Sequence, residues 1–359
     1  MENKNNNQPK KLNLMSARAL QQMDLPTLNK VVDKILYEGL AILSGPPKNG
    51  KSWLVLQLAY SVVKGVPFLG HETVKSECLY LALEDGYGRL QKRLDTMLNG
   101  ELIPDGLYID IHSDRLDNGL LDQLSNVLKE KPNIKLVIID TLQLIRGEMN
   151  RNNGVYANDY KDISVLKEFA DRNHISILLV HHFRKMKDES DAFNMVSGSN
   201  GIIGAADTLF ALYKKRRTDK HVVFSMTGRD IEDEELVLYP DSKTHNWCVN
   251  GTLEELEREM EKELYSYNPI VITIKKLLEE SDNNYILLSS SELYNKVIEI
   301  TGTRPKEKSP SALTKHMNSK LQYDLLEYDN IHYQAPSKNG GASGRKMYFC
   351  RSNRQKNIS

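Results

Sequence analysis

The stretch "GPPKNGKSW", residues 45–53, has the residue types and spacing of a phosphate-binding loop. Gly45, Gly50, Lys51 and Ser52 fit the pattern G-x-x-x-x-G-K-[ST], and the stretch lies between a short apolar run and an amphipathic segment. Glycines here let backbone N–H groups converge on phosphate oxygens, and the start of a helix adds its positive end. The predicted contacts to ATP come from Gly45, Lys48, Asn49, Gly50, Lys51, Ser52 and Trp53.

Hydrolysis needs an acid beside the metal ion and a group that activates water. The run "KLVIID", 135–140, ends in Asp140, which is predicted to bind Mg²⁺ together with Ser52. The run "CLYLALEDG", 78–86, delivers Glu84 and Asp85 at what would be the ligand edge of an open α/β sheet. Glu84 is predicted to polarise the attacking water. Asp85 is the rival for that role, although it could also be the N-cap of the following helix.

The run "ISILLVHH", 175–182, ends in two histidines. Adjacent residues of a strand point to opposite faces, so His181 and His182 are not expected to share one metal ion. One of the two imidazoles is predicted to face the nucleotide and to sense its γ phosphate. Which one does so stays open, and a structural histidine is the alternative for either.

Short apolar runs alternate with amphipathic segments from Gly39 onward, which is typical of a mainly parallel sheet covered by helices on both faces. Strand-like runs at 208–213, 221–228 and 236–240 then follow without helices and predict an antiparallel extension. Residues 35–250 are therefore expected to form one α/β domain. Residues 1–34 are expected to be a polar tail followed by a helical arm that is interrupted at Pro26.

The C-terminal third reads as a different kind of structure. Residues 251–265 are acidic and predict a solvated connecting helix, and residues 266–355 contain three helix signals followed by two strand-like pieces around a Gly-rich tip. This outline predicts a winged-helix-like α+β domain. Residues 301–359 hold 11 Lys or Arg against 4 Asp or Glu, which favours DNA over protein as the partner. The residues expected near DNA are Ser311, Thr314, Lys315, Asn318, Lys338, Arg345 and Lys346.

Composition excludes several classes of protein. The chain has 359 residues, of which 40% are apolar and 27% charged, and 48 basic residues balance 48 acidic ones. The longest apolar runs are far shorter than the roughly 20 residues of a membrane-spanning helix. Three widely spaced cysteines disfavour a disulfide framework and a zinc site, so a cytoplasmic location is expected.

Six motifs occur in an order that resembles a known family. They are "GPPKNGKSW", "LYLALEDGYGRLQKRL", "LVIIDTLQLIRG", "LLVHHFRK", "GSNGIIGAADTLFAL" and "TGRDIEDEELVL". In this order they are similar to the RepA-type hexameric replicative helicases of plasmids, phages and mobile elements, which are RecA-fold ATPases related to DnaB-type helicases. The resemblance covers about residues 15–245, and the winged-helix outline lies beyond it.

The resemblance implies a hexameric ring in which ATP binds between neighbouring copies. By it, Glu84 matches the catalytic glutamate, Asp140 the metal-side aspartate, and His181 or His182 the sensor. Arg229 matches an arginine finger that acts on a neighbour's nucleotide, a task suited to a planar guanidinium. Related helicases often have Lys two positions earlier, where this chain has Thr227. The basic run "KKRR" at 214–217 could assist the finger, but a solvated hairpin tip is favoured.

Two long polar loops at the ligand edge, 144–160 and 184–201, are predicted to line a central channel for single-stranded DNA. Their basic residues are Arg146, Arg151, Arg184, Lys185 and Lys187. The expected function is thus an ATP- and Mg²⁺-dependent ring-forming DNA helicase. A RecA-type recombination ATPase that forms filaments, and a DNA-binding initiator or regulator that uses ATP as a switch, are the alternatives.

Overall fold

The computed structural model describes residues 14–25, 27–148, 155–183, 192–196, 200–216, 218–336 and 346–351, with the side chains of residues 155, 156 and 200 excepted. Contacts within the chain divide it into two units, Met1–Asn250 and Gly251–Ser359. Within the described ranges, no helix combines the length and the apolar character needed to cross a membrane.

A nine-stranded sheet forms the centre of the first unit, in the order β11-β10-β9-β8-β3-β7-β6-β4-β5. The pairs from β8 to β5 are parallel, whereas β8–β9 and β9–β10 are antiparallel. The predicted α/β class, with a mainly parallel sheet and a late antiparallel extension, is confirmed. The strands are β3 Gly39–Gly45, β4 Glu77–Ala82, β5 Leu107–Asp110, β6 Ile134–Asp140, β7 Ser176–His182, β8 Thr208–Tyr213, β9 Val222–Gly228, β10 Glu234–Pro240 and β11 Trp247–Thr252.

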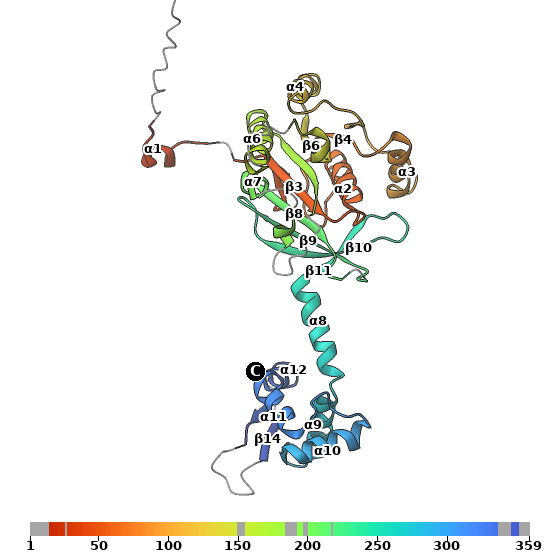
Figure 1. Ribbon diagram of the computed structural model, residues 1–359, viewed down its shortest axis with the longest axis vertical. Coiled ribbons are helices and arrows are strands. Elements are labelled where there is room, and N and C mark those ends of the chain that lie inside the picture. The colour runs from red at the N-terminus through yellow and green to blue at the C-terminus, as the bar shows by residue number, and fades with distance from the viewer. Residues whose placement is uncertain are drawn as a thin grey trace, which may run out of the picture. The chain divides into compact units, whose positions relative to one another are not determined.

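Helices cover both faces of this sheet, and Figure 1 shows β3 between them. On one face α2 and α3 pack on alternate strand residues such as Ala41 and Leu43. On the other face α4, α5, α6 and α7 pack on the intervening residues such as Leu40 and Ile42. Both sets are buried because strand side chains alternate between two covered faces. The helices are α2 Lys51–Lys64, α3 Tyr87–Met97, α4 Leu120–Glu130, α5 Leu142–Ile145, α6 Val155–Asn173 and α7 Asn200–Ala205, with a 3₁₀ turn η1 at Ala192–Met195.

The segment before β3 differs from the prediction. Helix α1 spans only Ala17–Gln21, with the Ser16 side chain as its N-cap, and has no buried residue. The helical spacing predicted after Pro26 is wrong, because residues of this stretch form the antiparallel pair β1 Lys30–Val32 and β2 Leu36–Tyr37. Val31, Val32, Ile35 and Leu36 are buried in the same core as α2, so packing on the sheet overrides the local helical pattern.

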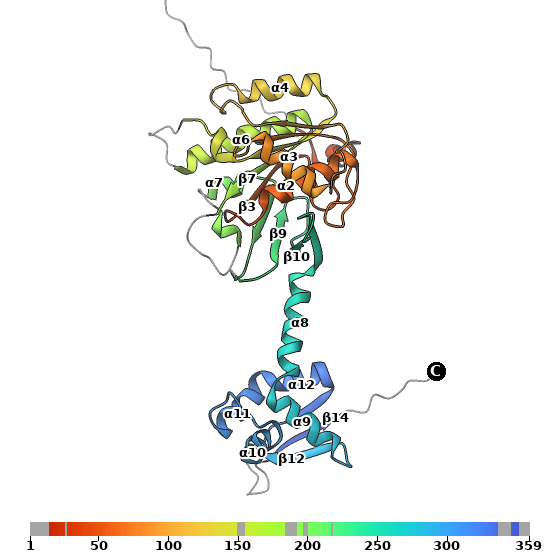
Figure 2. The same cartoon turned by 90° about the vertical axis from the view of Figure 1, so that its right-hand side faces the viewer.

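The second unit begins with α8 Leu253–Ser266, which Thr252 and Glu255 start with a capping box. A three-stranded antiparallel sheet, in the order β12-β14-β13, packs with four further helical segments around a separate core (Figure 2). The predicted cap Ser309 and first-turn Pro310 are confirmed, while β12 was missed by the sequence reasoning. The elements are α9 Pro269–Glu279, β12 Tyr285–Ser289, α10 Ser290–Thr301, α11 Pro310–His316, a π turn η2 Met317–Leu321, α12 Gln322–Asp329, β13 Ile331–Gln334 and β14 Lys346–Arg351.

The core of the second unit yields a stability prediction. Phe349 is fully buried and its ring lies 5.2 Å from that of Tyr333. Phe349→Ala should lower the free energy of unfolding of this unit by about 3–5 kcal/mol. Both tryptophans, Trp53 and Trp247, belong to the first unit. Urea unfolding followed by circular dichroism should therefore show an earlier transition, while tryptophan fluorescence should not move.

The control for this prediction is Tyr323→Ala, since Tyr323 is 64% exposed and its removal should change stability by less than about 0.5 kcal/mol. An equal shift of the circular dichroism and tryptophan transitions in Phe349→Ala would contradict the prediction.

Candidate functional site

The predicted catalytic residues gather at one edge of the sheet, where parallel strands end together. β3 ends at Gly45, beside His182 at the end of β7. β6 ends at Asp140, beside Ala82 at the end of β4, and Glu84 follows two residues later. The Leu83 N–H donates to the Asp140 carbonyl at 2.8 Å, which fixes the backbone that carries Glu84.

The phosphate loop joins β3 to α2 through residues with a left-handed backbone. Lys48 has a φ of 66° and Gly50 a φ of 88°, and Gly50 is the N-cap residue of α2. A Cβ on Gly45 would meet the Leu212 carbonyl oxygen at 2.3 Å, so only glycine fits beside β8. The N-terminal N–H groups of α2 therefore point toward the space above the strand ends, where the positive end of a helix favours an anion.

Trp247, near the end of the first unit, supports this loop and was not predicted as a site residue. Its indole Nε1 donates to the Gly50 carbonyl at 3.4 Å, and a Cβ on Gly50 would lie 2.5 Å from the indole ring. The side chain of Gln57 on α2 bonds both the N–H and the carbonyl of Trp247, at 2.7 and 3.0 Å. A tryptophan almost 200 residues from the loop gives no local signal, so only the fold could reveal this contact.

Lys51 is buried and lies against the loop, where its Nζ donates to the carbonyls of Gly45 at 2.8 Å and Pro46 at 3.0 Å. Burial lowers the pKa of Lys51 to about 8, and the carboxylates of Asp140 and Glu84 oppose this shift. A lysine that is costly to keep charged gains from an incoming phosphate, because the phosphate oxygens stabilise the ammonium form.

Ser52 and Asp140 form the predicted metal-side pair. The Ser52 hydroxyl donates to Asp140 Oδ2 at 3.0 Å, and the Tyr80 hydroxyl donates to the same oxygen at 3.2 Å. Burial raises the pKa of Asp140, the two hydrogen bonds oppose the shift, and Glu84 adds to it. Two adjacent oxygen groups beside the phosphate loop fit Mg²⁺, which takes one or two protein oxygens and completes its shell with phosphates and water. Tyr80, like Trp247, was not predicted.

Glu84 and Asp85 have different surroundings. The Glu84 side chain is half exposed and faces His182, with 3.6 Å between Oε1 and Nε2. The Asp85 side chain is buried and is ion-paired with Arg89, at 2.8 Å, and with Arg93. Asp85 is not the N-cap of α3, since Gly86 occupies that position. Its oxygens are committed to two arginines, so Glu84 is the better placed of the two to meet a water molecule.

The two histidines also separate. His181 is buried within β7, whereas the His182 side chain is 37% exposed at the strand end and faces Glu84. The arrangement favours His182 over His181 as the residue that can report the γ phosphate to Glu84.

Arg229 lies at the other edge of the sheet. β9 runs antiparallel to β8, so Gly228 pairs with Thr208 at the start of β8. The Arg229 side chain is 58% exposed and contacts Asp207, 3.2 Å from Nη1 to Oδ1, beside the start of β3. β3 rises about 3.3 Å per residue over Gly39–Gly45, so Arg229 is roughly 20 Å from the phosphate loop of its own chain.

The predicted DNA contact at Arg146 is wrong. Its guanidinium is only 11% exposed and is ion-paired with Asp159 and with Asp162, the latter at 3.2 Å from Nε. It joins α5 to α6 instead of lining a channel. Arg151, Arg184, Lys185, Lys187, Lys338 and Arg345 lie outside the described residues.

On the second unit, the predicted DNA-facing residues differ in accessibility. Ser311, Lys315 and Asn318 are exposed, as is Lys346 on β14. Thr314 bonds the Ser290 hydroxyl and the Pro310 carbonyl, so it faces α10 and not solvent. The prediction for Thr314 is therefore wrong, because helical spacing alone did not show which face packs on α10.

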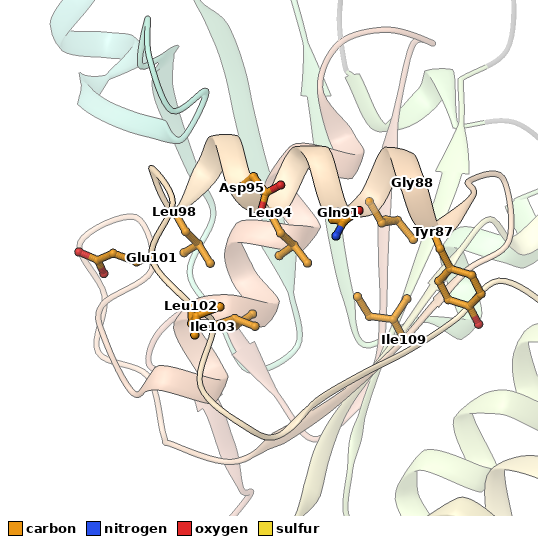
Figure 3. A pocket seen from close by; sticks show the side chains of 11 residues that line it. Tyr87, Gly88, Gln91, Leu94, Asp95, Leu98, Glu101, Leu102, Ile103 and Ile109 are labelled. Atoms are coloured by element: carbon orange, nitrogen blue, oxygen red, sulfur yellow. The ribbon is translucent and has the colours of Figure 1, made fainter.

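A groove of about 440 Å³ lies away from the phosphate loop, between α3 and residues 101–103. Figure 3 shows Leu94, Leu98 and Ile109 pointing into it, while Glu101 points away. None of the predicted catalytic residues lines this groove. The chemistry is therefore concentrated at the strand ends and not in the groove.

Comparison with known families agrees with this geometry. The model of the AAA domain family matches residues 8–188, half of the chain, including the loop, Glu84, Asp140 and both histidines. The chain belongs to the AAA domain family. As a member of this family of ATPases, it has an ATP site in the phosphate loop between β3 and α2.

Individual relatives are more distant. The DNA repair protein RadA of Rickettsia bellii is 27% identical over 181 residues, which are 48% of this chain and 36% of that protein. The chain thus spans about a third of that relative's length. Two solved structures have a TM-score of 0.48 and 14% identity: an isolated ATPase domain, over 59% of this chain and 84% of that one, and a DnaB-like replicative helicase described with its primase interactions, over 58% and 57%.

The buried state of Lys51 predicts how ATP affinity depends on pH. The free protein holds Lys51 at a pKa of about 8, and bound phosphates should raise that pKa. Below pH 8 the ammonium is already charged. Above it, binding must take up a proton, so the apparent Kd should rise by up to about tenfold per pH unit until the pKa of the complex is reached. Isothermal titration in two buffers of different ionisation enthalpy measures this uptake.

The Lys51→Ala variant is the matched control and should bind ATP weakly with no such proton uptake. An affinity of the unmodified protein that stays constant from about pH 8 to about pH 10 would contradict the prediction.

Proposed function

We propose that this chain is the ATPase subunit of a ring-forming motor that moves along single-stranded DNA, with each ATP bound between two copies. The proposal follows the RepA-type resemblance of the motifs in residues 15–245. The match to a protein described as a DNA repair protein also supports DNA as the partner.

One observation carries the shared site. Arg229 is exposed, lies roughly 20 Å from its own phosphate loop, and sits at the opposite edge of the sheet. An arginine side chain cannot cover that distance. If Arg229 neutralises charge on ATP, the nucleotide is therefore one that is bound to a neighbouring copy.

The roles of the other residues follow from their surroundings. Lys51 and the start of α2 bind the phosphates. Ser52 and Asp140 would hold Mg²⁺, which supplies charge neutralisation when bound. Glu84 orients a water molecule and accepts its proton as the water oxygen attacks the γ phosphorus and the bond to the bridging oxygen breaks. His182, next to Glu84, would link the presence of the γ phosphate to the segment after β7.

A mixing experiment tests the shared site. Lys51→Ala and Arg229→Ala should each lose ATP hydrolysis, the second by about a thousandfold, because an arginine finger contributes about 10³–10⁵ to kcat. A mixture of the two should regain activity, since an intact finger then meets an intact loop. Steady-state hydrolysis with and without single-stranded DNA measures both effects, and DNA should stimulate the unmodified protein.

Arg172→Ala is the matched control, because Arg172 is an exposed arginine of the same unit that pairs with Glu168 on α6. It should leave hydrolysis unchanged. Unstimulated hydrolysis that survives Arg229→Ala would favour the alternative of an ATP-dependent DNA-binding switch. Filaments instead of rings in electron microscopy with an ATP analogue would favour a RecA-type recombination enzyme.

We further propose that the second unit is a winged helix that binds duplex DNA. The order helix–strand–helix–helix–strand–strand supports this, as does a group of exposed cations at the approach to α11. The group consists of Arg304, Lys306, Lys308 and Lys315. Glu307, the single acid between residues 304 and 316, is paired with His316 at 2.6 Å. The positive charge at this helix start is therefore left for phosphates.

Removing one of these cations should weaken duplex binding in a salt-dependent way. Lys308→Ala or Lys315→Ala should each reduce the slope of log K against log salt concentration by about one, because one phosphate fewer is neutralised. Fluorescence anisotropy with a labelled duplex at several salt concentrations measures the slope. Lys276→Ala is the control, since this exposed lysine of α9 is near Glu280. Identical slopes for all variants would point to a protein partner instead.

A further inference from the structure

A largely buried carboxylate connects Arg229 to the core at the edge of the sheet opposite the phosphate loop. Asp207 Oδ2 accepts from the Leu40 N–H at 3.1 Å, and the same carboxylate is ion-paired with Lys167 of α6. Arg229 Nη1 is 3.2 Å from Asp207 Oδ1, and the Arg229 N–H donates to the Asp207 carbonyl at 3.0 Å. One residue thus joins the start of β3, α6 and the end of β9.

The backbone around Asp207 is shaped for this close approach. A Cβ on Gly39 would lie 2.6 Å from Asp207 Oδ2, and one on Gly228 would lie 2.9 Å from the Asp207 carbonyl oxygen. Gly39 also has a φ of 114°, which side chains rarely adopt. Two glycines therefore leave the space in which Asp207 contacts β3 and the segment that carries Arg229.

Stability does not require the contact between Asp207 and Arg229. Leu40 and Lys167 already bind the carboxylate, whose side chain is only 12% exposed, whereas Arg229 is 58% exposed. An ion pair with so exposed a partner contributes little to stability. What the contact does fix is the direction of the guanidinium, which has five N–H donors and here uses Nη1 on Asp207.

We propose that Asp207, held in place by Lys167, is a positioning residue that aims Arg229 at the ATP of a neighbouring copy. The inference rests on the proposed shared site. Lys167 also brings a second positive charge to this edge, where Thr227, two residues before Arg229, has none. A defect at Asp207 or Lys167 should therefore appear only in the copy that supplies the finger.

The test assigns the two halves of the site to different chains. Lys51→Ala protein supplies a finger and no working loop, and Arg229→Ala protein supplies a loop and no finger. Adding Asp207→Asn or Lys167→Gln to the Lys51→Ala chain should lower kcat of the mixture about tenfold, as a misplaced catalytic group does, with little change in KM. Adding the same change to the Arg229→Ala chain should leave kcat within about twofold of the parent mixture.

Asparagine keeps an oxygen for the Leu40 N–H, and melting temperatures of all chains show whether the variants fold. Lys167→Arg should restore the activity that Lys167→Gln loses, and Arg172→Gln on the same helix should have no effect. Equal losses from both placements, or no loss from either, would overturn the positioning role while leaving the shared site intact. A parent mixture that stays inactive would reject the shared site itself, and this inference with it.

Discussion

The burial of β3 is the constraint on which the rest of the first unit depends. This strand has β7 and β8 as parallel neighbours and helices over both faces, so it can shift neither along its neighbours nor toward solvent. Its C-terminal end presents the phosphate loop, and its N-terminal end presents Leu40 to Asp207. A rigid strand of seven residues thereby holds two functional edges at a constant separation.

Electrostatics at the nucleotide edge are arranged around groups that burial penalises. Lys51 and Asp140 are both buried, and burial shifts each pKa toward the neutral form. Hydrogen bonds from Ser52 and Tyr80 oppose that shift for Asp140, and the loop carbonyls satisfy Lys51. Such a site is costly to maintain and gains most when a polyphosphate and a cation complete it, which is typical of functional sites and rare in structural ion pairs.

The sequence predicted most of the parallel sheet and the identity of the loop, because both have local signals. Alternating apolar residues reveal strands, and a glycine pattern between a strand and a helix reveals a phosphate site. The errors lie where packing decides. The stretch after Pro26 has helical spacing but pairs as β1 and β2, and Arg146 looked like a channel residue until two aspartates of α6 were found beside it. Strands β11 and β12 were missed because neither has a long apolar run.

What the sequence alone determined is chemical identity: a phosphate loop with Lys51 and Ser52, an acid at the end of each of two strands, and an arginine after a late strand. Only the tertiary structure decided which of these groups is free to act. It committed Asp85 to two arginines, left Glu84 beside His182, placed Trp247 under the loop, and put Arg229 at the far edge of the sheet. The reason is physical, since exposure and partners come from long-range packing, whereas residue type and spacing are local properties of the chain.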